Sequence, residues 1–396
     1  MRNSGLIGGK NLHYLWQYLR HLLVAVMIGF AAMPAMTAKA ENLVTGSAKN
    51  TLSATVIASL HHPWAMSFLD EDTLLVTTKP GQLWLFDRLR GQIMVDGVPD
   101  VLAGGQGGLG DVIPHPDFAS NQLIYLSYIA SDNGGKTRYA AVMSAKLMRG
   151  DTPKLTDHRL IWKQQPATSG KGHFSHRLAF APINSPYAGQ LFITSGDRQL
   201  QSPAQDMQQG LGKIIRLYDD GSIPKDNPFQ TDGALARTFW SIGHRNALGL
   251  AFDAGGQLWA HEMGPRDGDE LNMIHKGANY GWPVVSEGEH YDGTHIPSHP
   301  TRPDMTPPAA FWVPTIAPSG LIFYHGDMFP EWQGHAFIGG LKSRALIRLE
   351  LKNSQPVEAE RFRWSKRVRE VDQSPDGAIW VLEDGADGRL IQFTRP

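Results

Sequence analysis

The chain has 396 residues, of which 41% are hydrophobic and 19% charged, a composition typical of a globular protein. It excludes a disordered tail protein and a collagen, and the absence of cysteine excludes a disulfide scaffold, thiol chemistry and thiolate metal sites. The formal net charge is −1, and residues 1–40 hold four of the 37 basic residues and no acidic one. A mildly acidic chain with scattered charge has no electrostatic footprint for nucleic acid or anionic lipid.

Residues 1–40 are predicted to be a secretory signal peptide. The apolar run 22–30 follows three basic residues, and small residues at the −3 and −1 positions precede Glu41. A membrane anchor is the alternative, but the apolar run is shorter than the about 20 residues that span a bilayer. No second long apolar run follows, so we expect residues 41–396 to be a single exported domain in the periplasm.

One pattern recurs six times along the rest of the chain: a turn containing Pro, Gly or Asp, then a short run of Leu, Ile, Val and aromatic residues. Short apolar runs bounded by turn residues predict β-strands. We predict these six strands at residues 74–76, 123–126, 191–193, 258–260, 336–338 and 378–381. Further strands follow most of them, at residues 82–86, 213–217, 345–349 and 389–393.

Repetition at a spacing of roughly 40 to 80 residues predicts a ring of similar sheets. We therefore expect an all-β fold, a six-bladed β-propeller with four-stranded antiparallel blades. In such a ring each blade buries its faces on its neighbours, which lets one domain reach this length. The longest insertions, at residues 130–175, 197–212 and 262–320, are expected to be loops, and loops are where functional sites concentrate.

His173 is the first candidate for proton transfer, because histidine titrates near neutral pH. If residues 172–178 form a regular strand, His173 and His176 point to opposite sides and one of them faces the central channel. Asp197 follows the predicted strand 191–193, where a propeller strand reaches the mouth of the ring. A structural histidine and an ordinary Gly-Asp turn are the competing interpretations, since the chain has 16 histidines.

Two further segments hold groups that suit ligands. Arg245 offers a rigid fork for a carboxylate and Asn246 offers both a donor and an acceptor, although a tight turn with a surface salt bridge is equally compatible. The loop 261–272 is rich in oxygen donors that suit a hard cation such as Ca²⁺, but it lacks the spacing of an EF-hand. A solvated acidic loop is the alternative there.

Trp312, held by two nearby prolines, could stack on a planar ligand or belong to the core. Arg367 and Arg369 alternate along one strand and, with Lys342, could bind an anionic group or form a solvated strand face. Together these groups indicate a flat, polyanionic, metal-chelating cofactor beside a base. The residues alone do not name that cofactor.

The order of these segments resembles the soluble quinoprotein glucose and aldose sugar dehydrogenases, which use pyrroloquinoline quinone (PQQ) and Ca²⁺ on a six-bladed propeller. The resemblance covers about residues 55–395, nearly all of the mature chain. The phrases that carry it are GQGGL at 105–109, HPDF at 115–118, DGSIPKDNPF at 220–229, GHRN at 243–246, GP at 264–265, NYGWP at 279–283 and WVPTIAPS at 312–319.

The resemblance implies a role for each candidate. His173 would be the base that takes the anomeric proton, Asp197 would orient it, and Arg245 would polarise the reacting quinone carbonyl. The quinone would be bound by Gln106, His173, Arg245, Asn246, Trp312, Lys342, Arg367 and Arg369.

Two Ca²⁺ sites and a reaction are also implied. A catalytic Ca²⁺ would be bound by the carbonyls of Gly264 and Pro265, and a second, structural Ca²⁺ by Glu270 and Tyr280. An aldose would be oxidised at C1 to a lactone by hydride transfer to PQQ, and reduced PQQ would pass its electrons to a separate acceptor. Residues 175–176 depart from the small residues usual in the family, and the imidazole of His176 is expected to narrow the substrate entrance or to shift His173.

Two other interpretations share the expected fold. A Ca²⁺-dependent propeller lactonase would not need cations and an aromatic side chain around a large planar ligand. A non-enzymatic binding propeller would keep the ring without the reactive site. In every case we expect a monomer or a homodimer without a nucleic-acid partner.

Overall fold

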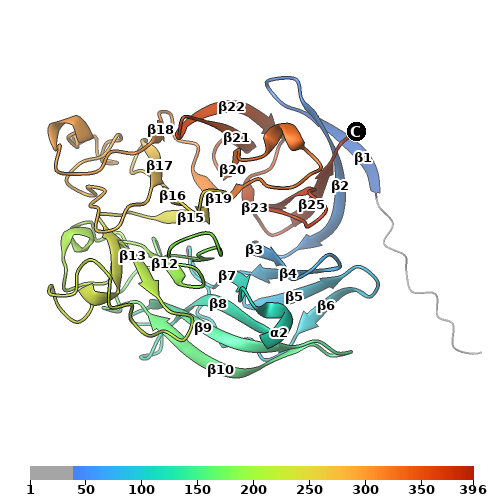
Figure 1. Ribbon diagram of the computed structural model, residues 1–396, viewed down its shortest axis with the longest axis horizontal. Coiled ribbons are helices and arrows are strands. Elements are labelled where there is room, and N and C mark those ends of the chain that lie inside the picture. Colours follow the sequence, from blue (N-terminus) through green and yellow to red (C-terminus); the bar gives the residue numbers. More distant parts are fainter. Residues whose placement is uncertain (1–38) are drawn as a thin grey trace, which may run out of the picture. The chain divides into compact units, whose positions relative to one another are not determined.

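The computed structural model describes residues 39–396, so the predicted signal peptide lies outside the described residues except for its last two positions. These residues form six antiparallel sheets arranged as a ring (Figure 1). The prediction of a six-bladed β-propeller with four-stranded blades is confirmed. Within the described part of the chain, no helix has both the length and the apolar character needed to cross a membrane.

Five of the sheets each consist of four strands that are consecutive in the chain, so each of these blades is built from local hairpins. Their strands are β3 (Pro63–Phe68), β4 (Thr73–Thr78), β5 (Gln82–Asp87), β6 (Gly91–Val95), β7 (Leu109–Pro114), β8 (Leu123–Ala130), β9 (Tyr139–Met148), β10 (Lys154–Lys163), β11 (Ser175–Phe180), β12 (Leu191–Ser195), β13 (Lys213–Leu217), β14 (Phe239–Ile242), β15 (Ala247–Phe252), β16 (Leu258–Glu262), β17 (Asp269–Met273), β18 (Ala310–Trp312), β19 (Pro318–Phe323), β20 (Ala336–Gly340), β21 (Ala345–Lys352) and β22 (Gln355–Arg363).

The sixth sheet closes the ring with the two ends of the domain. Strand β2 (Thr51–Leu60) pairs antiparallel with β25 (Gly388–Thr394), and β1 (Lys39–Thr45) adds a fifth strand outside β2. The sheet is completed by β24 (Ile379–Glu383) and β23 (Val368–Gln373). The hydrogen bonds between β2 and β25 therefore join the N-terminal part of the domain to its C-terminal blade and close the ring.

Helices are short and lie in the connections between strands. They are α2 (Phe118–Asn121), η1 (Ser202–Gln205), η2 (Ala236–Thr238), η3 (His299–Thr301) and η4 (Pro330–Trp332).

The six strands predicted from the recurring pattern all form the second strand of a blade, namely β4, β8, β12, β16, β20 and β24. The first strands, β3, β7, β11, β15, β19 and β23, contact one another around the central axis. The expectation of a loop over residues 130–175 is wrong, because β9 and β10 form a long hairpin there. Strand β10 is largely exposed and polar, so the apolar pattern that marks the other strands is absent from it.

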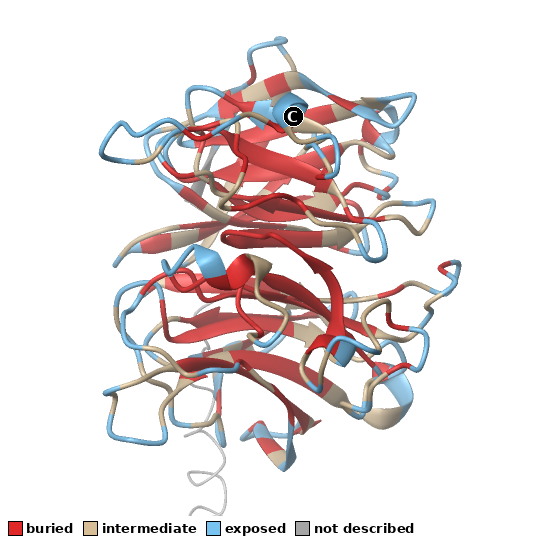
Figure 2. Ribbon diagram, turned by 90° about the vertical axis from the view of Figure 1, so that its left-hand side faces the viewer, coloured by how far each residue is buried: buried red, intermediate tan, exposed pale blue. Residues whose placement is uncertain are grey.

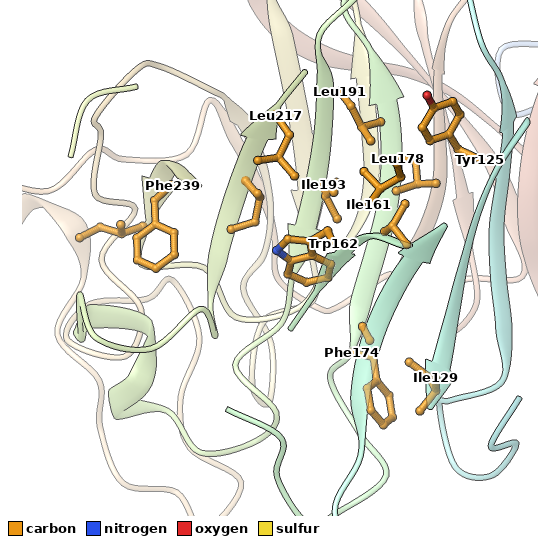
Figure 3. Close-up of a cluster of buried hydrophobic side chains, with 14 of the residues drawn as sticks. Tyr125, Ile129, Ile161, Trp162, Phe174, Leu178, Leu191, Ile193, Leu217 and Phe239 are labelled. Carbon is orange, nitrogen blue, oxygen red and sulfur yellow. The ribbon is translucent and has the colours of Figure 1, made fainter. Parts of the chain in front are cut away.

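Apolar side chains fill the spaces between blades, and buried residues gather in the strands while exposed ones lie in the loops (Figure 2). One such cluster joins two neighbouring blades through Ile129 and Tyr125 on β8 and Leu178 and Ile193 on β11 and β12 (Figure 3). Phe174, which precedes β11, belongs to the same cluster. This packing anchors the segment that carries the two candidate histidines.

Candidate active site

A cavity of about 400 Å³ lies on the central axis, where residues from all six blades meet. This volume falls within the range of small-molecule sites. Trp64 comes from β3, His176 from β11, Leu248 from β15 and Arg369 from β23, and Gln106 precedes β7. The cavity therefore exists only when the ring is closed.

His173 and Asp197 form a buried pair at this cavity. His173 Nδ1 lies 2.7 Å from Asp197 Oδ1, and the other carboxylate oxygen accepts a hydrogen bond from Trp282 Nε1 at 2.8 Å. The backbone N–H of His173 donates to Gln106 Oε1 at 2.7 Å. Gln106 and Phe174 both line the cavity, so His173 lies at its edge. The carboxylate fixes the imidazole orientation, as a base requires.

The segment before β11 is not a regular strand. The φ angles of His173, Ser175 and His176 are 46°, 58° and 60°, all in the left-handed region, and the pairing of β11 with β12 shifts between Ser175 and Leu178. Alternation along a regular strand therefore does not set the directions of the two histidines. Gly196 allows the close approach of this segment, because a Cβ there would lie 2.1 Å from the carbonyl oxygen of His173.

The environment keeps His173 neutral and Asp197 ionised. Burial lowers the pKa of His173, and the opposing hydrogen bond and charge of Asp197 do not fully compensate. Burial alone would raise the pKa of Asp197, but the hydrogen bond and charge of His173, with further donors, hold it below its usual value. A neutral imidazole beside an ionised carboxylate can accept a proton and stabilise the resulting charge.

Cations form another part of the cavity wall. Arg367 Nε donates to Asp384 Oδ2 at 2.8 Å, and Arg369 Nη2 donates to Asp384 Oδ1 at 2.7 Å. Lys79 Nζ donates to the carbonyl of Gly105 at 2.7 Å. Two arginines thus share one carboxylate and Lys79 lines the same cavity, and this excess of positive charge suits an anionic ligand. Sequence reasoning missed Lys79, although it directly follows the second strand of its blade, as Asp384 does.

Two predicted quinone contacts lie elsewhere. Lys342 is exposed on the turn after β20, one residue beyond Leu341, which lines the cavity. Trp312 is buried between blades, where its Nε1 donates to Glu358 at 3.0 Å, and it does not line the cavity. Trp312 lies on β18, the outer strand of its blade, and its large side chain packs into the hydrophobic cluster between this blade and the next. The tryptophan among the residues that line the cavity is Trp64, and Phe174 lines it as well.

Arg245 and Asn246 carry buried donors without a partner. Arg245 Nη1 donates to the carbonyl of Met263 at 2.9 Å, while Arg245 Nε and Asn246 Nδ2 are buried and make no hydrogen bond to any residue in 39–396. Asn246 Oδ1 accepts from Ser175 at 3.2 Å. Unpaired buried donors are costly, so these two atoms fit a ligand that supplies oxygen acceptors.

The four predicted Ca²⁺ ligands are brought together. Gly264, Pro265, Glu270 and Tyr280 line one small hollow of about 10 Å³, together with Glu262. Burial and the neighbouring charge of Glu262 raise the pKa of Glu270 well above its usual value. Two buried carboxylates, those of Glu262 and Glu270, and the cation Arg245 are among the side chains that line this hollow, and its size allows no more than one hard cation.

The hydroxyl of Tyr280 does not take part in this arrangement. It donates to the carbonyl of Met273 at 2.5 Å and accepts from the backbone N–H of His275, and the carbonyl of Tyr280 accepts from His299 at 3.2 Å. Among residues 39–396, no group of three or more His, Cys, Asp or Glu side chains is arranged to hold a metal ion. A cation here would therefore also depend on backbone oxygens.

Comparisons with known proteins identify the family of this chain. A model of the glucose/sorbosone dehydrogenase family matches residues 60–392. The aldose sugar dehydrogenase YliI of Escherichia coli is 38% identical over 342 residues, which cover 85% of this chain and 90% of that protein. The crystal structure of the apo-form of the soluble aldose sugar dehydrogenase from Escherichia coli has a TM-score of 0.80 at 37% identity and covers 87% of this chain and 100% of that chain. The PQQ-bound aldose sugar dehydrogenase of Streptomyces coelicolor has a TM-score of 0.69 at 25% identity, with coverage of 90% and 99%. The chain therefore belongs to the glucose/sorbosone dehydrogenase family.

Proposed function

We propose that this protein is a PQQ- and Ca²⁺-dependent dehydrogenase that oxidises the C1 hydroxyl of aldoses to give lactones. The observation that carries the proposal is a buried His–carboxylate pair directly beside a cavity that is walled by cations: Gln106 and Phe174, the neighbours of His173, line this cavity. The aldose sugar dehydrogenase named among the relatives and the PQQ-bound neighbour support it.

The residues present fit both groups. Lys79, Arg367 and Arg369 would hold the carboxylates of the quinone, and the free donors of Arg245 and Asn246 would bind its oxygens. One Ca²⁺ ion would be bound in the hollow lined by Gly264, Pro265, Glu270 and Tyr280, where the resemblance implies two ions. When bound, PQQ supplies a two-electron acceptor for hydride, and Ca²⁺ supplies a Lewis acid.

His173 is proposed as the general base. Its Nδ1 is engaged by Asp197, so Nε2 is the nitrogen that takes the proton of the anomeric hydroxyl. Loss of that proton to Nε2 and of the C1 hydrogen as hydride turns the hemiacetal carbon into a lactone carbonyl. Asp197, ionised and buried, stabilises the imidazolium formed in this step. Arg245 would polarise the acceptor carbonyl through its free Nε–H.

The proposed protein works outside the cytoplasm. The predicted signal peptide supports export to the periplasm, and the absence of cysteine supports a fold that needs no oxidation step. Electrons from the sugar would leave to a separate acceptor protein or small molecule.

The test is a titration of the purified metal-free protein with PQQ and Ca²⁺, followed by assays with a dye acceptor across a panel of aldoses. We expect a saturable absorbance change and dye reduction that needs both additions. Arg369→Met should weaken PQQ binding at least about tenfold, whereas Lys366→Met, an exposed cation nearby, should not. Lactone hydrolysis without quinone would support the lactonase interpretation, and no absorbance change would support a binding propeller.

A further inference from the structure

His176 lines the central cavity but has no part in the proposed chemistry. It is 1% exposed and stacks on Trp64, with ring centroids 5.0 Å apart and planes 12° from parallel. Gly110 on β7 leaves the space that the imidazole fills, because a Cβ at Gly110 would lie 2.0 Å from His176 Cε1. Two neighbouring strands thus build a niche that holds this ring against the cavity.

The backbone of His176 adopts a conformation that a histidine rarely takes. Its φ angle is 60°, and that of Ser175 is 58°. Glycine would adopt this conformation without strain, so an imidazole here costs free energy that the surrounding structure must offset. The stacking contact with Trp64 holds the imidazole at the cavity wall despite this backbone conformation, so the ring is presented to a ligand.

Hydrogen bonds define which nitrogen of His176 carries the proton. Ser127 Oγ accepts the backbone N–H of Asp111 at 2.7 Å and lies 2.7 Å from His176 Nδ1. Within residues 39–396, Nδ1 is the only acceptor within reach of the Ser127 hydroxyl proton. That hydroxyl therefore donates to Nδ1, which places the imidazole proton on Nε2. Nε2 makes no hydrogen bond to the described residues, so it is free to donate to a ligand.

His176 stays neutral, unlike a histidine that acts as a base. Burial, and then the charges of Arg177 and Arg198, lower its pKa to about 3. No carboxylate hydrogen-bonds to its ring among the described residues, in contrast to the pairing of His173 with Asp197. At neutral pH the ring therefore offers one fixed N–H donor and no positive charge.

We propose that His176 binds the cofactor of the central cavity by donating its Nε2 proton to an acceptor atom of a planar, polycarboxylate quinone. This inference rests on the proposed function, since it assigns a residue to the same site. The stack of His176 on Trp64 holds one directional donor at the cavity wall, and this fixed donor restricts how a planar ligand is oriented between the cations and His173.

The test compares PQQ affinity in three variants with Ca²⁺ present, followed by tryptophan fluorescence and by quinone absorbance. His176→Phe keeps a ring beside Trp64 but removes the donor, and it should weaken PQQ binding about tenfold to a hundredfold. His176→Gln should recover a large part of the affinity, because its amide nitrogen can occupy the place of Nε2. The matched control is His261→Gln, which changes another buried histidine that lies outside the cavity wall.

The outcomes separate this inference from the proposed function. If the wild-type protein does not bind PQQ, the proposed function fails. If the wild type binds and His176→Phe binds equally well, the function stands and the role of His176 is overturned. Ser127→Ala is the second test, for use if His176→Phe does not fold. It leaves the imidazole in place but removes the hydroxyl that fixes the ring proton on Nε2. A several-fold loss of PQQ affinity in Ser127→Ala supports the inference, and unchanged affinity contradicts it.

Discussion

The surroundings of His173 and His176 differ, although both residues lie in one left-handed segment. His173 faces a buried carboxylate, whereas His176 faces a hydroxyl and lies near two arginines. The first arrangement can take up a proton and stabilise the charge, and the second can only donate. The comparison shows that the partner of a histidine, more than its burial, decides its chemistry.

Replacing His173 should have the largest effect. In His173→Gln the base is lost, so turnover with a dye acceptor should fall by at least about a hundredfold. PQQ affinity, measured in the same titration as above, should change little, because the cationic wall is intact. Turnover close to that of the wild type would show that another group is the base.

The neutral state of His176 predicts a smaller effect on acid stability. The pKa of His176 is about 3 in the folded protein and about 6.5 in the unfolded chain. Below pH 6.5 the unfolded state therefore binds more protons than the folded state, and the free energy of unfolding decreases as the pH is lowered. At pH 5 this group costs about 2 kcal/mol. Urea denaturation at pH 8 and pH 5 should therefore show a smaller pH-dependent loss in His176→Gln than in the wild type. An equal loss in both proteins would mean that His176 is already protonated in the fold.

Changing Asp197 tests whether its carboxylate is what allows His173 to act as a base. Asp197→Asn removes the group that raises the pKa of His173, so that pKa should fall further below 6.5. We expect turnover to drop at least about tenfold, because the imidazolium loses its counter-charge. In the wild type the acid limb of the pH profile of kcat/KM should lie below pH 6.5, and in Asp197→Asn it should move to lower pH. A shift to higher pH would contradict the assigned pair.

The smallest expected effect concerns the niche of His176. Gly110→Ala would press on the imidazole and should cost about 1 kcal/mol of stability, since a side chain rather than backbone must move. Gly249→Ala is the matched control, because a Cβ there would lie 2.1 Å from His261 Nε2. Both variants should have lower urea midpoints, but only Gly110→Ala should weaken PQQ binding. Equal affinities would show that the niche serves packing alone.

The ring could be predicted from sequence because its second strands carry the strongest pattern. Apolar runs such as 191–193 and 336–338 follow clear turns, and each forms a buried second strand. First strands were harder to find, since they surround the axis and contain buried charges. Strand β23, for example, includes Glu370 and Asp372, which a reading based on hydrophobicity treats as surface.

The site could be predicted only in part. Asp197 and Asp384 both follow the second strand of a blade, as Lys79 does, so the repeat places these residues at one end of the axis. The position after the second strand of each blade therefore also identifies Lys79 as a residue of the site. Trp312 could not be placed in this way, because it ends a short outer strand whose neighbours are not visible in the sequence.

The seam between β2 and β25 has a consequence for biogenesis. Arg369 and Asp384 reside in the blade that this seam completes, so one wall of the cofactor cavity is missing until the extreme C-terminal strand docks on the beginning of the domain. A chain that lacks its last strand cannot complete the cavity wall. Under the proposed function, cofactor loading is therefore expected to follow synthesis of the whole chain and closure of the ring.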